Sequence, residues 1–555
     1  MQLVECVPNF SEGKDKKILD AISSVIKSVK GVSLLDVDPG ADTNRTVFTF
    51  VGQPEPVIEA AFGAIKKASE LIDMSKHKGS HPRMGATDVC PFVPVSNITM
   101  DECVQLAKKL GKRVGDELEI PVYLYEYAAS KPDWKNLATV RKGEYEALPK
   151  KMEDPKWKPD FGPQKFNAKS GATAISAREF LIAYNINLNT RDRKKAKDIA
   201  LTIREKGRWA RNKNRKILRD ENGKKLRQEG LFPNCKAIGW FIDEYDRAQV
   251  SMNLTNYKVS PPHKVLDKVR QLAWEKGIQV TGSELVGLLP KDAILNAGHY
   301  YLDKLGESRG IPEKMIVQTA IQSMGLDELA PFEIDEKIIE YAIDKDDKLI
   351  NMSLNNFCDE LSTDSPAPGG GSIAALCSAI SGSLTAMVSN LTIGKKKYKK
   401  VWSDAKELAL KGQNVKERSL VAIDKDTQAF YDMMDAMRLP KKKEKDKKIR
   451  ATAIQKATKN AIMVPMETLE IALDAVKIAK SISKIGNENA VSDAGVAAIT
   501  ANAAAKSAFL NVKINMGGIE DEDWKDNILQ KADKLKAKVD DLALEVESVV
   551  QKSFD

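Results

Sequence analysis

Residues 44–68, NRTVFTFVGQPEPVIEAAFGAIKKA, predict a strand, a turn that contains proline and then an amphipathic helix. Apolar residues alternate over 46–51, as in a strand with one buried face, and recur at helical spacing over 57–72. Residues 248–273, AQVSMNLTNYKVSPPHKVLDKVRQLA, repeat this layout. Because a layout that recurs within one chain indicates an internal repeat, we expect two related α/β subdomains, each a small sheet with helices on one face.

The surrounding segments extend the same pattern. A second pair of stretches, VPNFSEGKDKK (7–17) and NINLNTRDRKK (185–195), each passes from a strand through asparagine into a helix. Apolar periodicity in the first half predicts strands at 3–8, 32–38, 46–51, 121–125 and 180–188, and helices at 15–27, 57–72 and 100–111.

After about residue 331 the composition changes. Residues 333–350, EIDEKIIEYAIDKDDKLI, form a charged connector, and from Ser353 the chain is rich in Ala, Lys and Leu at helical spacing. We therefore expect an α+β protein with two α/β sandwich-like subdomains and an all-helical domain. The expected boundaries are listed here: 1–178; 179–327, with a basic insert at 204–229; a linker at 328–352; and 353–555.

The positive charge is concentrated in one segment. The chain has a net charge of +9, and residues 204–229 alone carry eleven basic and four acidic residues, a net of +7. ENGKK within this insert is a turn signal, so a charged hairpin is expected. Such a segment can bind nucleic acid, but the sequence has no RNA-binding fingerprint or row of aromatic residues for base stacking.

The remaining bulk features favour a cytoplasmic protein. Six scattered cysteines without a CxxC pair argue against a disulfide framework and a zinc ribbon. The start, MQLVECVPNFSEG, lacks the apolar core of a secretory signal. Residues 365–394 carry no charge, but Ser, Ala, Gly and Thr dominate them, which favours a packed helix over a membrane span.

The stretch HKGSHPRM (77–84) holds two of the four histidines. Pro82 disfavours a helix at His81, and no glutamate separates the histidines, so this is not the HExxH zinc motif and no metal is expected. A loop histidine suits proton transfer at neutral pH, although it can also simply cap or pack a loop. Acids and arginines near it in sequence suggest a site for an anionic, nitrogen-bearing substrate. These are Asp36, Asp38, Arg45, Arg83 and Asp88.

The first 327 residues closely resemble the glutamate formimidoyltransferase family. The matching stretches are ECVPNFSEG, LLDVDPGADTNRTVFTFVG, HKGSHPRMGATDVCPFVPV, GEYEALPKK, PDFGPQKF, GATAISAREFLIAYNINL and GWFIDEYDRAQVSMNL. The resemblance implies transfer of a formimino group from N-formimino-L-glutamate to N5 of tetrahydrofolate. The insert at 204–229 is longer than the corresponding region of animal members.

The resemblance also assigns residues. It places the catalytic histidine on His81, the acidic helper on Asp38 and the folate-binding segment on 162–171. One histidine can take the N5 proton and protonate the leaving nitrogen if an aspartate orients it. From the chemistry of carboxylate recognition, Arg45 and Arg83 are candidates to clamp the glutamate; structural ion pairs are the alternative. His77 is expected to support the loop or contact substrate. The residues taken from the folate segment are Gly162, Pro163, Phe166, Ser170 and Gly171.

The helical part, over 353–550, resembles formimidoyltetrahydrofolate cyclodeaminases and the related methenyltetrahydrofolate cyclohydrolases. The matching stretches are APGGGS, LTIGKKKY, DKDTQAFYDMMDAMRLPK and NENAVSDAGVAA. The resemblance assigns the catalytic aspartate to Asp426, which takes the N10 proton during ring closure. Asp424 and Asp426 point about 200° apart on a helix, so spacing alone leaves open which one faces a site. Glycines in APGGGS can present backbone N–H groups to an anion or simply allow close helix packing.

These resemblances imply a bifunctional enzyme of histidine degradation and one-carbon metabolism. It is expected to use tetrahydrofolate in polyglutamated form, to need no metal, to bind neither nucleic acid nor membrane, and to form a homo-oligomer such as an octamer. The run at Lys395, Lys396, Lys397 and Lys399 is a candidate contact for the polyglutamate tail, or simply a solvated surface. Three alternatives stay open: a glutamate formyltransferase fused to a methenyltetrahydrofolate cyclohydrolase, a nucleic-acid-binding protein that uses the insert, and a folate-binding scaffold with one inactive site.

Overall fold

The computed structural model describes residues 2–40, 44–79, 82–343, 349–365 and 367–554. Packing divides the chain into two compact units. The first contains Met1–Ala297 and Ile321–Lys345, and the second contains Gly298–Ala320 and Asp346–Asp555. The expected α+β class with a helical C-terminal part is confirmed.

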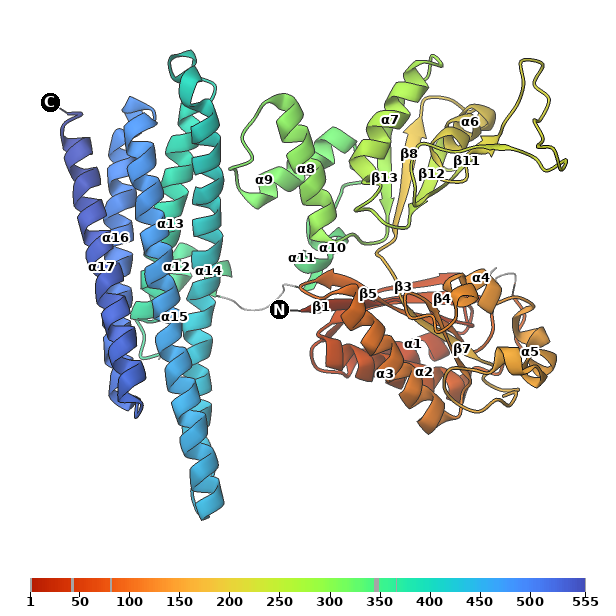
Figure 1. The fold of residues 1–555 in the computed structure, drawn as a ribbon, viewed down its shortest axis with the longest axis horizontal. Coiled ribbons are helices and arrows are strands. Elements are labelled where there is room, and N and C mark those ends of the chain that lie inside the picture. Colours follow the sequence, from red (N-terminus) through yellow and green to blue (C-terminus); the bar gives the residue numbers. More distant parts are fainter. Residues whose placement is uncertain (1, 41–43, 80–81, 344–348, 366, 555) are drawn as a thin grey trace. The chain divides into compact units, whose positions relative to one another are not determined.

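A mixed sheet, sheet 1, forms the N-terminal part of the first unit (Figure 1). Its spatial order is β3, β4, the β1/β2 pair, β5, β7 and β6, with β5, β7 and β6 parallel to one another. The strands are β1 (Leu3–Cys6), β2 (Asn9–Phe10), β3 (Val32–Gly40), β4 (Arg45–Gly52), β5 (Thr87–Ser96), β6 (Val122–Glu126) and β7 (Thr173–Ala177).

Three amphipathic helices cover one face of sheet 1 (Figure 1). They are α1 (Lys16–Lys27), α2 (Pro54–Leu71) and α3 (Met100–Leu118). Their apolar stripes bury Ile22, Ile58 and Leu110 against the sheet, where Phe10 and Phe48 meet edge to face at 5.2 Å. The segment between β6 and β7 adds α4 (Leu137–Val140) and α5 (Glu144–Glu153).

A second sheet, sheet 2, repeats this topology. Its antiparallel strands lie in the order β11, β12, β8, β13. Strand β8 therefore corresponds to β1/β2, β11 to β3, β12 to β4 and β13 to β5, and both sheets have the split β-α-β arrangement. The internal repeat expected from the sequence is present. The elements are β8 (Ile182–Leu188), α6 (Arg193–Ile203), β11 (Cys235–Ile242), β12 (Arg247–Leu254), α7 (Pro262–Trp274) and β13 (Val280–Val286).

Equivalent aspartates begin equivalent helices in the two repeats. The side chain of Asp15 accepts a hydrogen bond from the backbone N–H of Lys17 at the start of α1. Asp192 does the same for Lys194 at the start of α6. Each satisfies a donor that the helix leaves without an intrahelical partner.

Two central strands of sheet 1, β5 and β7, were not predicted from the sequence. For β5 the reason lies in its composition. Pro91 and Pro94 lie within β5, and prolines argue against a central strand because they cannot donate to the ladder. The strand nevertheless pairs on both sides, with β1 and β2 on one side and β7 on the other. Irregular register beside β1 and β2 accommodates the prolines, and the carbonyl of Pro91 still accepts from the N–H of Val7 at 3.2 Å.

The basic insert forms the expected hairpin as a narrow ribbon, which branches at its far end into two short hairpins. Strands β9 (Arg208–Trp209) and β10 (Arg227–Gln228) pair at its base. Beyond them, residue 218 bonds to residues 210 and 226 through backbone groups. Turns at Asn212 and Asp220 reverse the chain twice.

The second unit is helical. Helices α13–α17 pack side by side as long antiparallel rods (Figure 1), and α12 lies beside them. Gly382 on α13 and Gly412 on α14 lie so close that a β-carbon on either would approach the other's carbonyl oxygen to about 2.7 Å. The helices are α12 (Leu354–Leu361), α13 (Gly370–Thr392), α14 (Trp402–Arg438), α15 (Glu444–Ile485), α16 (Val491–Asn515) and α17 (Glu522–Gln551).

The uncharged segment identified in the sequence is α13. By length and composition this helix could cross a membrane, but 61% of its most apolar window is buried inside the unit. It packs on α14 and α16, whose alanines, such as Ala501 and Ala505, admit close approach. Helices α8 (Lys291–Leu305), α9 (Glu313–Met324), α10 (Ile334–Lys337) and α11 (Ile339–Ile343) lie between the strands of the first unit and this bundle in sequence.

Replacing Asp15 by alanine should lower the free energy of unfolding by about 1 kcal/mol, because α1 loses its N-terminal cap. Urea unfolding followed by circular dichroism measures the change. The matched control is Asp20→Ala, an exposed position inside the same helix. Equal effects of the two substitutions would show that the cap contributes nothing.

Two candidate active sites

The first site lies where the segment before β5 meets the segment before β7. Gly85 and Gly171 form a bridge, and the N–H of Ala86 donates to the carbonyl of Ser170 at 2.9 Å. A β-carbon on Gly171, whose φ is +68°, would lie 2.2 Å from the carbonyl oxygen of Met84. Glycine is therefore required there. The predicted catalytic His81 lies outside the described residues. The contact with Gly171 fixes the position of Met84, which follows His81 closely in the chain.

Arg83 is a structural cation here. Its buried guanidinium donates to both carboxylate oxygens of Glu146, at 2.7 and 3.0 Å, and to Glu144 at 3.1 Å. Both glutamates belong to α5, within the GEYEALPKK stretch. These bonds raise the pKa of Arg83 and fix the loop to α5. Of the two alternatives considered for Arg83, the geometry favours the ion pair.

His77 supports the same loop. Its Nδ1 accepts a hydrogen bond from Nε of Arg83 at 3.3 Å. The ring proton therefore lies on Nε2, which is 2.9 Å from the carbonyl oxygen of Asn44. Both ring nitrogens therefore have partners, and His77 joins the loop to the start of β4. Of its two expected roles, support of the loop and contact with substrate, this geometry matches the first.

A buried carboxylate lies behind the loop. Asp88 accepts from the N–H of Met84 at 3.0 Å and from Arg141 at 2.7 Å. Burial raises the pKa of Asp88 to about 6, although Arg141, the Met84 N–H and Arg45 oppose the rise. Burial, followed by the charge of Arg141, lowers the pKa of Arg45, whose charge also acts on Asp88. The result is a locally positive, partly buried patch.

Asp38 lies on β3, at the edge of sheet 1, and its side chain is exposed. It faces Val47 in the ladder, two positions along β4 from Arg45, and its charge acts on that arginine. Burial and the charge of Asp38 raise the pKa of Asp36. The edge therefore carries two acids beside the arginine patch.

The predicted folate segment runs along α5 and back to the loop. Phe166 packs on Tyr145 with ring centroids 5.5 Å apart, and the Tyr145 hydroxyl donates to the carbonyl of Ala168. Tyr145 also donates its N–H to the carbonyl of Arg83. Ser170 is buried, whereas Gly162 and Pro163 are exposed. The contacts bring the C-terminal half of this segment to the loop that carries His81.

The second site is a cavity of about 210 Å³ among α13, α14, α15 and α16. Asp426 lines it from α14, and its Oδ2 accepts from the hydroxyl of Ser372 at 3.1 Å. Burial raises the pKa of Asp426, while the hydroxyl and backbone N–H of Ser372 oppose the rise. A partly buried carboxylate of this kind suits general acid–base catalysis at neutral pH.

Glycine makes the position of Asp426 possible. A β-carbon on Gly371 would lie 2.1 Å from Oδ1 of Asp426. The carboxylate therefore rests against the first turn of α13, where N–H groups and the helix dipole favour negative charge. The sequence left two roles open for APGGGS: presenting backbone N–H groups and allowing close helix packing. Both roles occur here, at the first turn of α13.

The structure also separates the two neighbouring aspartates. Asp424 accepts a hydrogen bond from the backbone N–H of Leu349 at 3.2 Å, and it does not line the cavity. Asp426 is the one that faces the cavity. The lysine run lies elsewhere, with Lys397 bonded to Glu488 at 2.5 Å.

Sequence reasoning missed several residues of these sites. Arg141 lies two residues before the GEYEALPKK stretch, yet no local pattern marks it. Ser372 lies inside APGGGS, which drew attention only for its glycines. Asn511 and Asn515 line the second cavity, and their spacing of one helical turn is the one signal that a sequence offers.

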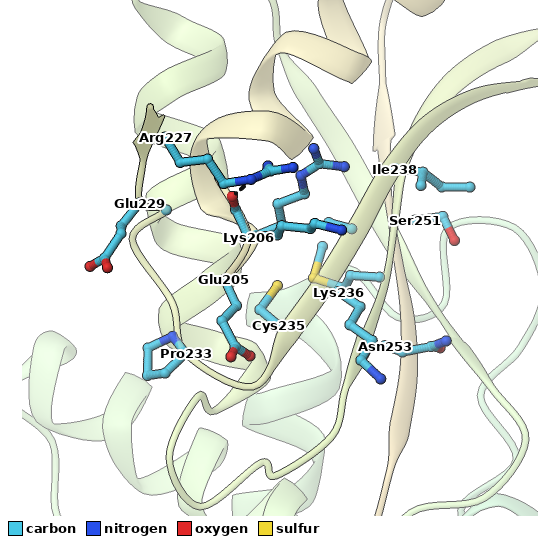
Figure 2. A pocket seen from close by; sticks show the side chains of 14 residues that line it. Glu205, Lys206, Arg227, Glu229, Pro233, Cys235, Lys236, Ile238, Ser251 and Asn253 are labelled. Carbon is cyan, nitrogen blue, oxygen red and sulfur yellow. Dashed lines mark hydrogen bonds between the residues drawn. The ribbon is translucent and has the colours of Figure 1, made fainter. Parts of the chain in front are cut away.

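A larger cavity, of about 1200 Å³, lies beside the basic insert (Figure 2). Arg204, Lys206, Arg227 and Lys236 line it, and none of the predicted site residues does. Burial and the nearby charges of Arg227 and Arg208 lower the pKa of Arg204. Figure 2 shows the Glu229 carboxylate turned away from Arg227. One wall of this groove is therefore positive.

No cluster of three or more His, Cys, Asp or Glu side chains that could hold a metal ion occurs among the described residues. The buried cysteines Cys6 and Cys90 are free thiols that share a hydrogen bond, with their sulfur atoms 3.5 Å apart.

Known families match almost the whole chain. The formiminotransferase domain, N-terminal subdomain, matches residues 3–178; the formiminotransferase domain matches 183–344; and the family formiminotransferase-cyclodeaminase matches 353–534.

Curated relatives agree with these matches. The chain is 42% identical to formimidoyltransferase-cyclodeaminase of Mus musculus, over 95% of this chain and 94% of the mouse protein. It is 44% identical to glutamate formimidoyltransferase of Thermoplasma acidophilum, over 56% of this chain and 95% of that protein. It is 37% identical to methenyltetrahydrofolate cyclohydrolase of Methylorubrum extorquens, over 34% of this chain and 90% of that protein.

The two candidate sites lie on two differently folded units, each within a separately matched region, and the mouse relative spans both units. The chain belongs to the formimidoyltransferase-cyclodeaminase family.

Proposed function

We propose that this chain is a bifunctional folate enzyme. Its first unit transfers the formimino group of N-formimino-L-glutamate to N5 of tetrahydrofolate and releases L-glutamate. Its helical unit then closes the ring to 5,10-methenyltetrahydrofolate and releases ammonia. One observation carries the proposal. Each half of the chain matches a family model, and each half has a polar site at the sequence motif that resembles that family.

In the transfer step, His81 takes the N5 proton as the amine attacks the formimino carbon. It then protonates the departing glutamate nitrogen, and Asp38 stabilises the imidazolium. The guanidinium groups of Arg45 and Arg141, which lie near each other, attract the substrate carboxylates through their positive charge. Arg83 and His77 hold the loop in place.

In the ring closure, Asp426 takes the proton of N10 as N10 attacks the formimino carbon, and it returns a proton to the leaving nitrogen. Its raised pKa makes the carboxylate a stronger base, which suits it to accept the N10 proton. The folate lies across the mouth of the cavity, with the one-carbon unit inside.

The folate is proposed to be polyglutamated. The positive wall of the groove beside the insert is a suitable surface for a chain of carboxylates, and Lys395, Lys396 and Lys399 offer further positive charge. Holding the tail would raise the effective concentration of the intermediate at the second site. A cytoplasmic homo-oligomer, such as an octamer, that acts in histidine degradation completes the proposal.

A coupled assay with N-formimino-L-glutamate and tetrahydrofolate tests both activities by following ammonia and the absorbance of methenyltetrahydrofolate. His81→Ala should abolish both products when the two substrates are supplied, but leave ring closure of added 5-formimidoyltetrahydrofolate intact. Asp426→Asn should stop the reaction at 5-formimidoyltetrahydrofolate. General acid–base catalysis makes losses of about 10²- to 10⁴-fold the expected size.

The same assay separates the main alternative. Release of glutamate without ammonia from the wild-type protein would favour a cyclohydrolase in the helical unit, as in the relative from Methylorubrum extorquens. Full activity of both variants would reject the residue assignments. Lys531→Ala, a change at an ion pair on α17, is the control that should retain both steps.

Ser372→Ala should move the acid limb of the pH–rate profile for ring closure to higher pH. The base form of Asp426 is active, and loss of the Ser372 hydroxyl removes a bond that lowers its pKa. Activity should therefore fall most at acidic pH and recover as pH rises. An unchanged limb would mean that Asp426 is not the titrating group.

Gly371→Ala should reduce ring closure at least about tenfold, because the new β-carbon would displace the Asp426 carboxylate. The transfer step, in the other unit, should be unaffected. Gly517→Ala is the matched control, since nothing lies within 4 Å of its added β-carbon. Wild-type ring closure in Gly371→Ala would contradict the observed contact.

A further inference from the structure

The cavity at Asp426 contains two amide side chains that the mechanism above leaves unused. Asn511 and Asn515 lie one turn apart on α16, and both line the cavity. Residues four apart on a helix lie on the same face. The two amides are therefore presented together to whatever occupies this space.

Hydrogen bonds fix the orientation of both amides. Nδ2 of Asn511 donates to the carbonyl oxygen of Ser507 at 2.9 Å, and Nδ2 of Asn515 donates to that of Ala461 at 3.0 Å. Each nitrogen is thus turned to the backbone, which leaves the amide oxygen as the acceptor on the other side. Within the described part of the chain, neither amide oxygen has a hydrogen-bond partner.

The two adjacent glycines at the start of α13 show where these amides lie with respect to Asp426. A β-carbon on Gly370 would lie 3.3 Å from Nδ2 and 3.7 Å from Oδ1 of Asn511. A β-carbon on Gly371 would lie 2.1 Å from Oδ1 of Asp426. The first turn of α13 therefore runs between the amide and the carboxylate. In a cavity of about 210 Å³, one small group can contact both.

We propose that the amide oxygens of Asn511 and Asn515 accept hydrogen bonds from the exocyclic nitrogen of the formimino group, and so select this group over its oxygen analogue. The inference rests on the proposed cyclodeaminase function. In its protonated, amidinium form the formimino group carries two N–H donors on its exocyclic nitrogen, which suit two acceptors. A formyl oxygen has no proton to donate and would face two further oxygens, an arrangement that leaves polar groups unpaired.

The same contacts place the leaving group. As the bond from N10 to the one-carbon unit forms, the N10 proton passes to Asp426. The bond from that carbon to the exocyclic nitrogen then breaks, and its electron pair stays on the nitrogen. This nitrogen keeps its two protons, receives from Asp426 the proton that came from N10, and departs as ammonia. The two amide oxygens hold it throughout, which favours its expulsion.

The test uses the full-length protein and chemically prepared 5-formimidoyltetrahydrofolate, so the transferase step does not contribute. Ammonia release gives kcat/KM, and inhibition of that release by 5-formyltetrahydrofolate gives Ki for the oxygen analogue. The variants are Asn511→Leu and Asn515→Leu, which remove the acceptor, and Asn511→Asp, which keeps one. Asn527→Leu, at an exposed site on α17 outside the cavity, is the matched control.

Each leucine variant should lower kcat/KM about 10- to 100-fold, the effect expected from loss of a hydrogen bond to a charged or strongly polarised group. Ki for 5-formyltetrahydrofolate should stay constant or fall, so the preference for nitrogen disappears. Asn511→Asp should keep the preference, and Asn527→Leu should match the wild type.

Two results would overturn the inference: wild-type kcat/KM for ammonia release in both leucine variants, or an equal loss of activity and of inhibitor binding in folded protein. Circular dichroism establishes folding. Failure of the wild type to release ammonia is a distinct result, because it would reject the cyclodeaminase function itself.

Discussion

Both candidate sites depend on backbone that comes closer to its neighbour than a β-carbon allows. In the helical unit, Gly371 lets the first turn of α13 rest against the Asp426 carboxylate. In the first unit, Gly171 lets the folate segment bond to the chain beside His81. These contacts hold the Asp426 carboxylate against backbone donors and the predicted folate segment against the neighbouring loop, and any larger residue would open the gap.

Buried charge sets the rest of the first site. Arg83 lies in the same short stretch as His81, and proximity in sequence suggested a shared role in binding substrate. In the fold it faces Glu144 and Glu146 on α5, which satisfy its guanidinium. Arg141, distant in sequence, instead reaches the buried Asp88. A buried ion must be paired to be tolerated, so the pairing decides which arginine fixes the loop and which contributes to the positive patch.

The repeat explains how one architecture carries different roles. Sheets 1 and 2 share their strand order, and Asp15 and Asp192 cap equivalent helices. Only sheet 1 gains the parallel strands β6 and β7, and the segment between them carries Arg141, Glu144, Glu146 and the folate segment. Sheet 2 gains the basic ribbon and its groove. The added segments, and not the shared core, differentiate the two halves.

The sequence by itself determined the periodicity of most strands and helices, the repeated layout, the helical second unit and the long motifs that indicate the family, because these are local patterns. It could not predict β5, since Pro91 and Pro94 argue against a strand unless irregular pairing with distant strands accommodates them. Only the tertiary structure decided that Asp426, rather than Asp424, faces a cavity, and that Ser372, Asn511 and Asn515 meet it there. The physical reason is that burial and hydrogen bonding in that cavity come from four helices far apart in the chain, and no local pattern records which of their faces meet.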